Sequence, residues 1–154
     1  MMSSVTGLFS FFLDKVINYL KLMGKDFEVG PGGIVVKDKV DDMDVEIQII
    51  PTEKWVRIQA KLDRLDDIPE DKRMEFLKEL LKANSDYPEI SFAIDDEGVI
   101  VSIEDEYVFA FYFDVFEEEY SAVLASIDIY RKIKDKILGI PAKVGKKKKE
   151  KEKS

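Results

Sequence analysis

Apolar and polar residues alternate along two neighbouring segments near the middle of the chain, "MDVEIQII" and "KWVRIQAKL". A period of two residues predicts strands with one buried face. Closing the two strands as a hairpin sets Ile49 opposite Val56 on the apolar face. The same register sets Ile50 opposite Trp55, so the only tryptophan of the chain lies on the polar face.

Apolar residues at spacings of three and four predict three helices. The first occupies the N-terminal segment and ends at Gly24. The second begins with Pro69, a residue favoured in a first turn, and ends around Asn84. The third runs from roughly Phe116 to Leu138, before a glycine and a proline that stop it.

The remaining alternating segments complete a sheet of about seven strands in two meanders. Segments 27–29 and 34–40 flank the glycine-rich loop "GPGG", and segments 90–94, 99–104 and 107–113 follow the second helix. Neither glycine-rich phosphate-binding fingerprint is present, so the loop is interpreted as a hairpin turn. We therefore predict an α+β domain of order α-ββββ-α-βββ-α, with an antiparallel sheet and helices mainly on one face.

The predicted last strand belongs to the aromatic stretch "EYVFAFYFDVF". The pattern resembles the aromatic run of an RNA-recognition strand, but the basic residue and glycine expected before it are absent and the surroundings are acidic. We predict that Tyr107, Phe109, Phe111 and Phe113 face the core. The alternate positions would then lie on the opposite face.

That opposite face is the candidate interface. It carries apolar and aromatic residues among charged ones, and a tryptophan and a tyrosine on an uncovered sheet face are candidate anchors for a partner. Shielding of the same residues by a loop or tail is the alternative. The candidate interface residues are Val35, Ile50, Trp55, Ile100, Val108 and Tyr112.

Composition is typical of one soluble domain: of the 154 residues, 45% are hydrophobic and 36% charged. We assign residues 1–141 to this domain and residues 142–154 to a disordered Lys-rich tail. The last ten residues, "GKKKKEKEKS", carry a net charge of +4, which leaves −12 on the rest of a chain whose net charge is −8. Nucleic acid would therefore meet an acidic body, and we expect at most weak contact through the tail.

Cysteine and histidine are both absent. Disulfides, thiolate or imidazole catalysis, and Cys- or His-based metal sites are therefore excluded, and we expect no cofactor, no metal and no catalytic residues. The acidic clusters "DDMD" (41–44) and "DDE" (95–97) lie at predicted hairpin turns, which Asp favours, although a weak divalent-cation site is an alternative there.

The chain also carries signals of its source and location. Only four Asn and Gln residues accompany twenty Lys and fifteen Glu, a usage typical of proteins from hot environments. The N-terminal apolar run is short and interrupted by Asp14 and Lys15, so neither a signal peptide nor a membrane span is expected. We expect a cytoplasmic protein of a thermophile.

The stretch "IPEDKRMEFLKELLKANSDYPEISFAIDDEGVIVSIEDE" resembles the central helix and following hairpin of YbjN-type domains, which share the fold of type III secretion chaperones. The resemblance covers about a quarter of the chain. It implies an α/β sandwich, often dimeric, that handles other polypeptides, and it carries over no catalytic residue. The corresponding positions are Pro69, Leu77, Leu80, Leu81, Asn84, Phe92, Asp95, Gly98 and Val99.

We therefore expect a noncatalytic protein-interaction or chaperone-like module that acts as a homodimer on an unidentified polypeptide client. Two other classes remain open at this point. One is a nucleic-acid-associated protein that uses the basic tail. The other is an enzyme that uses carboxylate or lysine chemistry.

Overall fold

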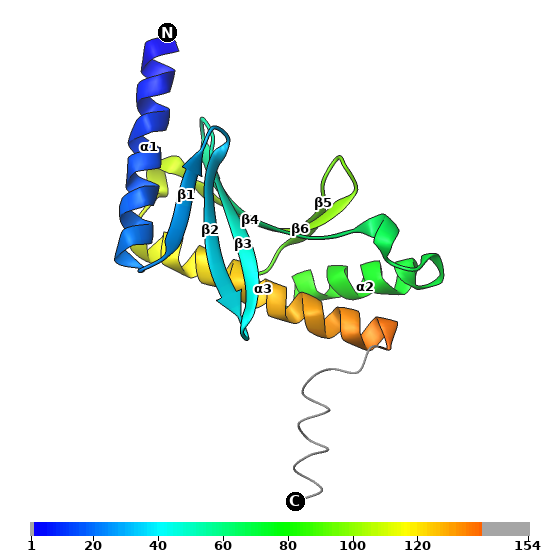
Figure 1. Ribbon diagram of the computed structural model, residues 1–154. Helices are drawn as coiled ribbons and strands as arrows, with labels where there is room; N and C mark the ends of the chain where they lie inside the picture. Colours follow the sequence, from blue (N-terminus) through cyan, green and yellow to red (C-terminus); the bar gives the residue numbers. More distant parts are fainter. Residues whose placement is uncertain (1, 140–154) are drawn as a thin grey trace, which may run out of the picture.

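The chain folds into three helices and one six-stranded sheet in the order α-ββββ-α-ββ-α (Figure 1). The computed structural model describes residues 2–139, with side chains described from residue 11, so the predicted tail at 142–154 lies outside the described residues. The helices are α1 (Met2–Leu22), α2 (Glu70–Asp86) and α3 (Phe113–Leu138). The strands are β1 (Asp26–Gly30), β2 (Gly33–Val40), β3 (Met43–Pro51), β4 (Trp55–Arg64), β5 (Phe92–Ile94) and β6 (Val99–Tyr107).

The α+β class, the antiparallel sheet and the three helices are confirmed. Strand order is β1-β2-β3-β4-β6-β5, with every neighbouring pair antiparallel. The two meanders are joined where β4 pairs with β6. None of the described helices combines the length and the hydropathy that a membrane span requires.

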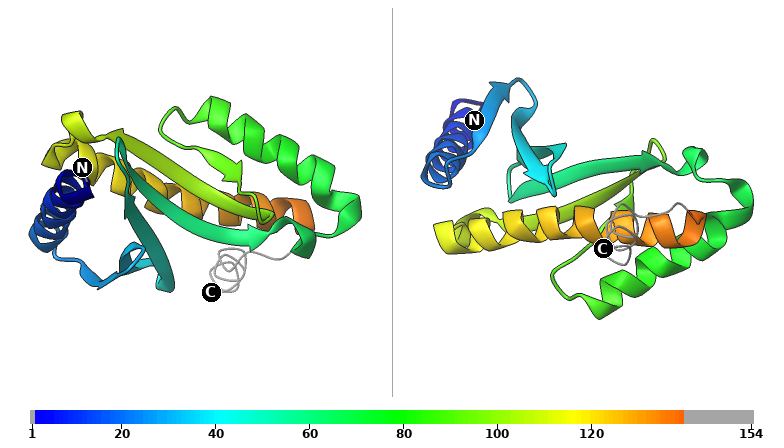
Figure 2. Two further views of the ribbon diagram at one scale, coloured as in Figure 1. Left: turned by 90° about the horizontal axis from the view of Figure 1, so that it is seen from above. Right: turned by 60° about the horizontal axis from the view of Figure 1, so that its bottom comes forward.

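All three helices pack on one face of the sheet, and α3 runs beneath both meanders (Figure 2). The N-terminal half of α3 buries Phe116, Tyr120 and Val123 in a core shared with α1 and β2–β4. Its C-terminal half buries Tyr130 and Ile137 in a second core with α2, β5 and β6. A single apolar stripe along one helix therefore holds the two meanders together.

The β2–β3 hairpin closes with the two-residue loop Asp41–Asp42, both at positive φ (49° and 68°). Two left-handed residues are the requirement of a type I′ turn, which matches the twist of the flanking strands. In the next hairpin Ile49 pairs with Ile58 and Pro51 with Val56. The predicted register is thus wrong by two residues, but an even shift leaves every side chain on its predicted face.

The β5–β6 register differs from the prediction by one residue, with Ile94 opposite Ile100. Gly98, at φ 79°, adds a left-handed residue before the second strand, as in a bulged turn. An odd shift exchanges the two faces of β6. Ile100, Ser102, Glu104 and Glu106 therefore face the helices, where Ser102 hydrogen-bonds Ser126 of α3.

The predicted seventh strand does not exist. β6 continues through the segment that was assigned to a turn and ends at Tyr107. A single 3-10 turn, η2 (Val108–Ala110), follows, and α3 begins at Phe113, earlier than predicted. The aromatic residues therefore line a corner rather than a strand, so their predicted alternation between faces is lost.

Candidate functional site

The face of the sheet opposite the helices is uncovered in the part of the chain that the structure describes (Figure 2). Trp55, Arg57 and Gln59 project there from β4, and Asp105 and Tyr107 project from the paired positions of β6. We call this surface the open face. It is built from adjacent strands of one sheet, so its side chains are held at fixed spacing.

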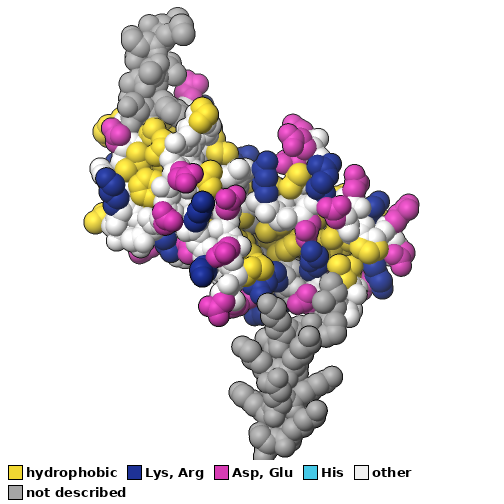
Figure 3. All heavy atoms as spheres, in the orientation of Figure 1, with side chains coloured by type: hydrophobic (Ala, Val, Ile, Leu, Met, Phe, Trp, Pro, Cys, Tyr) yellow, Lys and Arg dark blue, Asp and Glu magenta, His cyan; other side chains and the backbone are white. Residues whose placement is uncertain are grey.

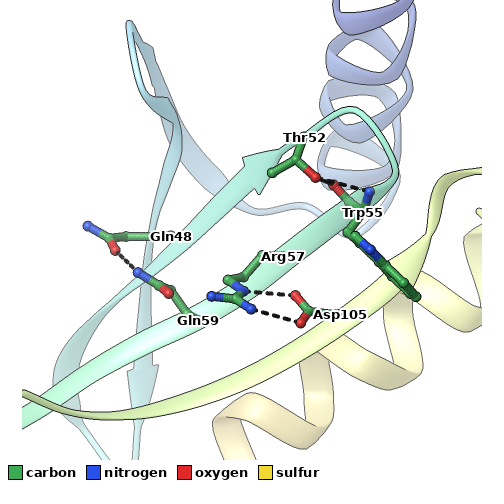
Figure 4. A network of polar contacts seen from close by, with 6 residues as sticks. All are labelled: Gln48, Thr52, Trp55, Arg57, Gln59 and Asp105. Atoms are coloured by element: carbon green, nitrogen blue, oxygen red, sulfur yellow. Dashed lines mark hydrogen bonds and ion pairs between the residues drawn. The ribbon is translucent and has the colours of Figure 1, made fainter. Parts of the chain in front are cut away.

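Two cross-strand pairs give the open face a polar centre (Figure 4). Arg57 donates two hydrogen bonds to the carboxylate of Asp105, from Nε to Oδ1 at 2.9 Å and from Nη2 to Oδ2 at 3.0 Å. This bond to Asp105 raises the pKa of the Arg57 guanidinium. The Gln59 amide donates to Oε1 of Gln48 at 2.6 Å. In each pair the two side chains hydrogen-bond one another, so the polar centre of the open face carries no unpaired charge from Arg57 or Asp105.

An aromatic ridge, defined as Trp55, Tyr107 and Phe109, borders the polar centre. The ring centroids of Trp55 and Tyr107 lie 5.6 Å apart, and those of Tyr107 and Phe109 lie 5.4 Å apart. Trp55 is 46% exposed, Tyr107 44% and Phe109 68%. Three large aromatic side chains that contact one another and remain exposed are typical of a site that binds another macromolecule.

The β3–β4 turn fixes the position of Trp55. The Thr52 hydroxyl accepts a hydrogen bond from the Trp55 amide at 3.0 Å and donates one to the Trp55 carbonyl at 2.8 Å. The Thr52 amide donates to the same carbonyl at 2.7 Å. The backbone amide and carbonyl of Trp55 are therefore both hydrogen-bonded to Thr52, as in other turns that a Ser or Thr hydroxyl stabilises (Figure 4).

The structure separates the six predicted interface residues into two groups. Val35 and Ile50 are half-buried on the outward side of the sheet, and Trp55 is exposed there. Tyr112, at the residue before α3, is 63% exposed. Ile100 and Val108 do not belong to the open face. Ile100 is fully buried against the helices because of the one-residue register shift, and Val108 is buried in η2.

Of the four aromatic residues predicted to face the core, Phe111 is buried and Phe113 is half-buried, but the prediction is wrong for Tyr107 and Phe109, which are exposed. The alternation of aromatic residues was the only available signal, and η2 interrupts it. Lys15 and Tyr19 of α1 both donate hydrogen bonds to the carbonyl of Phe111, at 3.1 and 3.3 Å. These bonds hold the segment between η2 and α3 against α1.

A second exposed apolar surface lies at the other end of the molecule. Met74 and Leu81 are seven residues apart on α2 and each is 67% exposed. Ile94, on the edge strand β5, is 45% exposed, and Tyr87 between the two elements is 48% exposed. β5 pairs only with β6, and the Asn84 carboxamide of α2 bonds the Phe92 amide and carbonyl on its other side, so little of that edge is free. We call this the α2–β5 surface.

Three carboxyl groups meet between β6 and α3. Glu106 is only 5% exposed, and neither of its oxygens has a hydrogen-bond partner among the described residues. Burial, with the nearby charge of Glu119, raises the pKa of Glu106 to about 8. Burial and the Glu119 carboxyl likewise raise the pKa of Glu104 to about 8. Glu104 and Glu106 therefore carry protons at neutral pH and resemble buried polar core residues.

Among residues 2–139, no group of three or more acidic side chains has the geometry of a metal site. Both acidic clusters of the sequence are used in turns. Asp41 and Asp42 form the type I′ turn, and Asp95 accepts hydrogen bonds from the amides of Glu97 and Val99 at 2.9 and 3.0 Å.

Comparison with known proteins gives structural relatives only. No family model matches the sequence, and no curated protein is similar to it. A chain of the HopA1–SchA chaperone–effector complex has a TM-score of 0.55 and 12% identity, over 86% of this chain and 98% of that one.

Two further relatives have the same fold over most of their length. A chain of the heterodimeric ExoU–SpcU complex from the type III secretion system of Pseudomonas aeruginosa has a TM-score of 0.57 and 13% identity, over 75% of this chain and 94% of that one. YbjN from E. coli has a TM-score of 0.54 and 14% identity, over 77% and 93%. The chain therefore has the fold shared by YbjN and type III secretion chaperones, as its resemblance to YbjN-type domains implied.

Proposed function

We propose that this chain is a noncatalytic, chaperone-like module that acts as a homodimer and binds a polypeptide client. The observation that carries the proposal is the aromatic ridge, whose three large side chains are exposed on a rigid sheet. Aromatic side chains contribute large contact areas with little loss of side-chain entropy, which suits them to anchor a partner. The Arg57–Asp105 and Gln59–Gln48 pairs lie beside the ridge and are already hydrogen-bonded, so they can form the polar rim of a contact with a client without leaving a charge unpaired.

Structural relatives support a polypeptide as the partner. The HopA1–SchA structure is a complex of a chaperone with an effector, and ExoU–SpcU is a heterodimer. Both contain this fold in contact with another protein chain. By analogy with these complexes, we infer that the present chain binds a polypeptide client and that the aromatic ridge is the surface that contacts it.

We assign self-association to the α2–β5 surface. The exposed apolar side chains of this surface can pack against the same surface of a second copy across a two-fold axis, which gives a closed, isologous contact. Met74, Leu81 and Ile94 would supply the apolar area of that contact. This arrangement leaves the aromatic ridge of each copy accessible.

Client binding is tested with a permanently unfolded probe, a reduced and carboxymethylated polypeptide labelled with a fluorophore. We expect saturable binding by the full chain, weakened at least about thirtyfold in Trp55→Ser/Phe109→Ser, as for loss of interface anchors. Leu22→Ser is the matched control, because it removes an exposed apolar residue outside both the ridge and the α2–β5 surface and should retain the affinity. Equal binding by all three proteins, or no binding at all, would overturn the assignment.

The homodimer is tested by light scattering during size-exclusion chromatography. We expect the mass of two chains for the wild type and of one chain for Leu81→Lys/Ile94→Lys, since a charge buried in an apolar contact is costly. The ridge variant Trp55→Ser should remain dimeric. A monomeric wild type, or a dimer lost only in the ridge variant, would contradict the proposed surface.

A further inference from the structure

A gap opens in the sheet where β3 and β4 stop pairing. The two strands are paired from Gln48–Gln59 to Pro51–Val56, and beyond the glutamine pair β3 continues with the first meander and β4 with the second (Figure 1). Segments 43–47 of β3 and 60–64 of β4 therefore each have one edge without a partner strand among the described residues. The space between them, bounded by α3 on the helix side, measures about 480 Å³.

Backbone hydrogen-bonding groups of both strands point into this gap. The β2–β3 hairpin closes with a two-residue loop, so the flanking residues Val40 and Met43 are hydrogen-bonded to each other and the bonding then alternates along β3. The amides and carbonyls of Asp44 and Glu46 consequently face away from β2. By the same alternation along β4, Lys61 presents its amide and carbonyl to the gap. Unpaired strand edges of this kind bind an added strand.

The floor of the gap is apolar. Val45, Leu62 and Ile127 line it, and Ile127 is almost fully buried. Figure 3 shows hydrophobic side chains in the hollow beside the β2–β3 hairpin. A strand in the gap would turn alternate side chains toward this floor, because successive side chains of a strand point to opposite faces. The floor therefore favours a segment in which every second residue is apolar.

The charged side chains around the gap balance one another. The lining carries three carboxylates and three cations, from Asp44, Glu46, Asp63, Lys61, Arg131 and Lys134. Asp63 is already bound, since it accepts from the Tyr130 hydroxyl at 2.6 Å and pairs with Lys134 at 2.8 Å. A lining without net charge favours an uncharged segment over a Lys-rich peptide or a nucleic acid, which would meet as many like charges as opposite ones.

The narrow end of the gap meets the open face. It ends at the Gln48–Gln59 pair, which belongs to the polar centre beside the aromatic ridge (Figure 4). Trp55 precedes Gln59 by four residues along β4, about 13 Å of strand. A polypeptide bound at the ridge can therefore reach the gap with one short extended segment.

Building on the proposed function, we propose that the polypeptide client inserts an extended, uncharged segment between β3 and β4 as an added strand. The segment contributes about five residues to the gap, as many as segment 43–47 of β3, and turns its apolar side chains toward the floor. Its backbone bonds the free groups of Asp44 and Glu46 on one side and of Lys61 on the other. The ridge anchors the client, and the gap selects the pattern and charge of the segment next to the anchor.

Amide hydrogen exchange of the full chain tests the added strand, with and without the saturating reduced and carboxymethylated polypeptide. We expect the amides of Asp44, Glu46 and Lys61 to exchange at least about tenfold more slowly in the complex, because each gains a strand partner. The amides of Met43 and Val45, which face β2, should change little. A probe that binds through the ridge without slowing the three amides would overturn the added strand and leave the proposed function standing. A probe that does not bind would overturn both.

Two short peptides with blocked ends test the chemistry of the segment. A five-residue peptide of alternating Thr and Val should slow the same three amides at millimolar concentration. The peptide with Lys in place of each Val should not, because it has no apolar face for the floor and carries charge into a balanced lining. Equal slowing by both peptides, or slowing by neither, would overturn an uncharged, alternating segment as the occupant.

Proline at position 46 tests the backbone contact. Glu46→Pro removes a donor that points into the gap without removing a bond to β2, and we expect it to weaken binding of the unfolded probe about tenfold. Glu46→Gln keeps the amide and should retain the affinity. Val29→Pro is the matched control, because alternation from the Gly30–Gly33 pair directs the Val29 amide away from β2 at the outer edge of β1.

Circular dichroism shows whether both proline variants are folded, and the exchange measurement on the wild type decides if Glu46→Pro is not. Unchanged affinity in a folded Glu46→Pro, or an equal loss in Val29→Pro, would contradict a strand between β3 and β4.

Discussion

The carboxamide of Asn84 on α2 exchanges two hydrogen bonds with the main chain of Phe92 on β5. Its Nδ2 donates to the Phe92 carbonyl at 3.1 Å, and its Oδ1 accepts from the Phe92 amide at 2.8 Å. Asn84 therefore imitates a neighbouring strand residue. It does not end the helix, as its position suggested, because α2 continues to Asp86. The contact holds the short strand β5 against the helix.

Replacing Asn84 with Ala should destabilise the fold by about 2–3 kcal/mol, since both polar groups of the Phe92 backbone lose their partner in a half-buried position. Chemical unfolding in urea measures the change. Ser85→Ala, at an exposed neighbouring position of the same helix, is the control and should alter the free energy of unfolding by less than about 0.5 kcal/mol. A loss of similar size in both variants would show that the α2–β5 contact is not responsible.

The sequence predicted the elements and the faces of the first meander, but it could not predict the faces of β6. Val99, Val101 and Ile103 alternate as an inward face would, yet the register brings Ser102, Glu104 and Glu106 under the helices. The cause is one left-handed residue, Gly98, whose conformation no hydrophobic pattern encodes. Along β6 the alternation of apolar residues therefore predicts the opposite inward face from the one that strand pairing produces.

The candidate site was partly predictable for the same reason. Trp55 and Ile50 lie on a strand pair whose register error was even, so their predicted face is correct. The faces assigned to Ile100 and Val108 depended on the register of β6 and on a seventh strand, and both residues are buried. Tyr107 lies on the open face through the register of β6, and Phe109 is exposed in the 3-10 turn, which the aromatic spacing did not signal.

Gly33 in the "GPGG" loop should not tolerate a side chain. Its φ is 137°, and a Cβ there would overlap the carbonyl oxygen of Ile49 on the neighbouring strand. We expect Gly33→Ala to cost about 2–4 kcal/mol through backbone strain and separation of β2 from β3. Thermal unfolding measures the loss. Gly32→Ala is the matched control, because a Cβ at that position meets no atom within 4 Å, and an equal loss there would contradict the argument.

Thr52 should affect the aromatic ridge through the turn that it closes. Thr52→Val keeps the shape of the side chain but removes both hydroxyl hydrogen bonds to Trp55, so we expect a loss of about 1 kcal/mol in stability. The fluorescence anisotropy of the single tryptophan should fall, because the backbone that carries it is less restrained. Thr52→Ser restores the hydroxyl and should restore both values. Unchanged anisotropy in Thr52→Val would show that the strand alone positions the indole.

The acidic groups between β6 and α3 predict an unusual dependence of stability on pH. Glu106 faces Glu119 of α3 and Tyr19 of α1, and Glu104 faces Glu119, Asp105 and Glu89. Apart from the Tyr19 phenol these neighbours are all carboxyls. The folded state therefore holds protons on Glu104 and Glu106 that the unfolded chain releases at lower pH.

Because the pKa of Glu106 rises from 4.5 to about 8 on folding, the native state binds more protons than the unfolded state between these values. The free energy of unfolding should therefore fall as the pH rises from about 4.5 to 8, by up to about 5 kcal/mol at about 1.4 kcal/mol per unit of pKa, and change little from this group above pH 8. Glu106→Gln mimics the protonated carboxyl and should be more stable than the wild type at pH 8.5, with no advantage at pH 4.5. Glu118→Gln, at an exposed position of α3, should leave the pH profile unchanged. Urea unfolding at half-unit intervals measures each profile, and a wild-type stability that rises through this range would show that Glu106 is ionised in the native state.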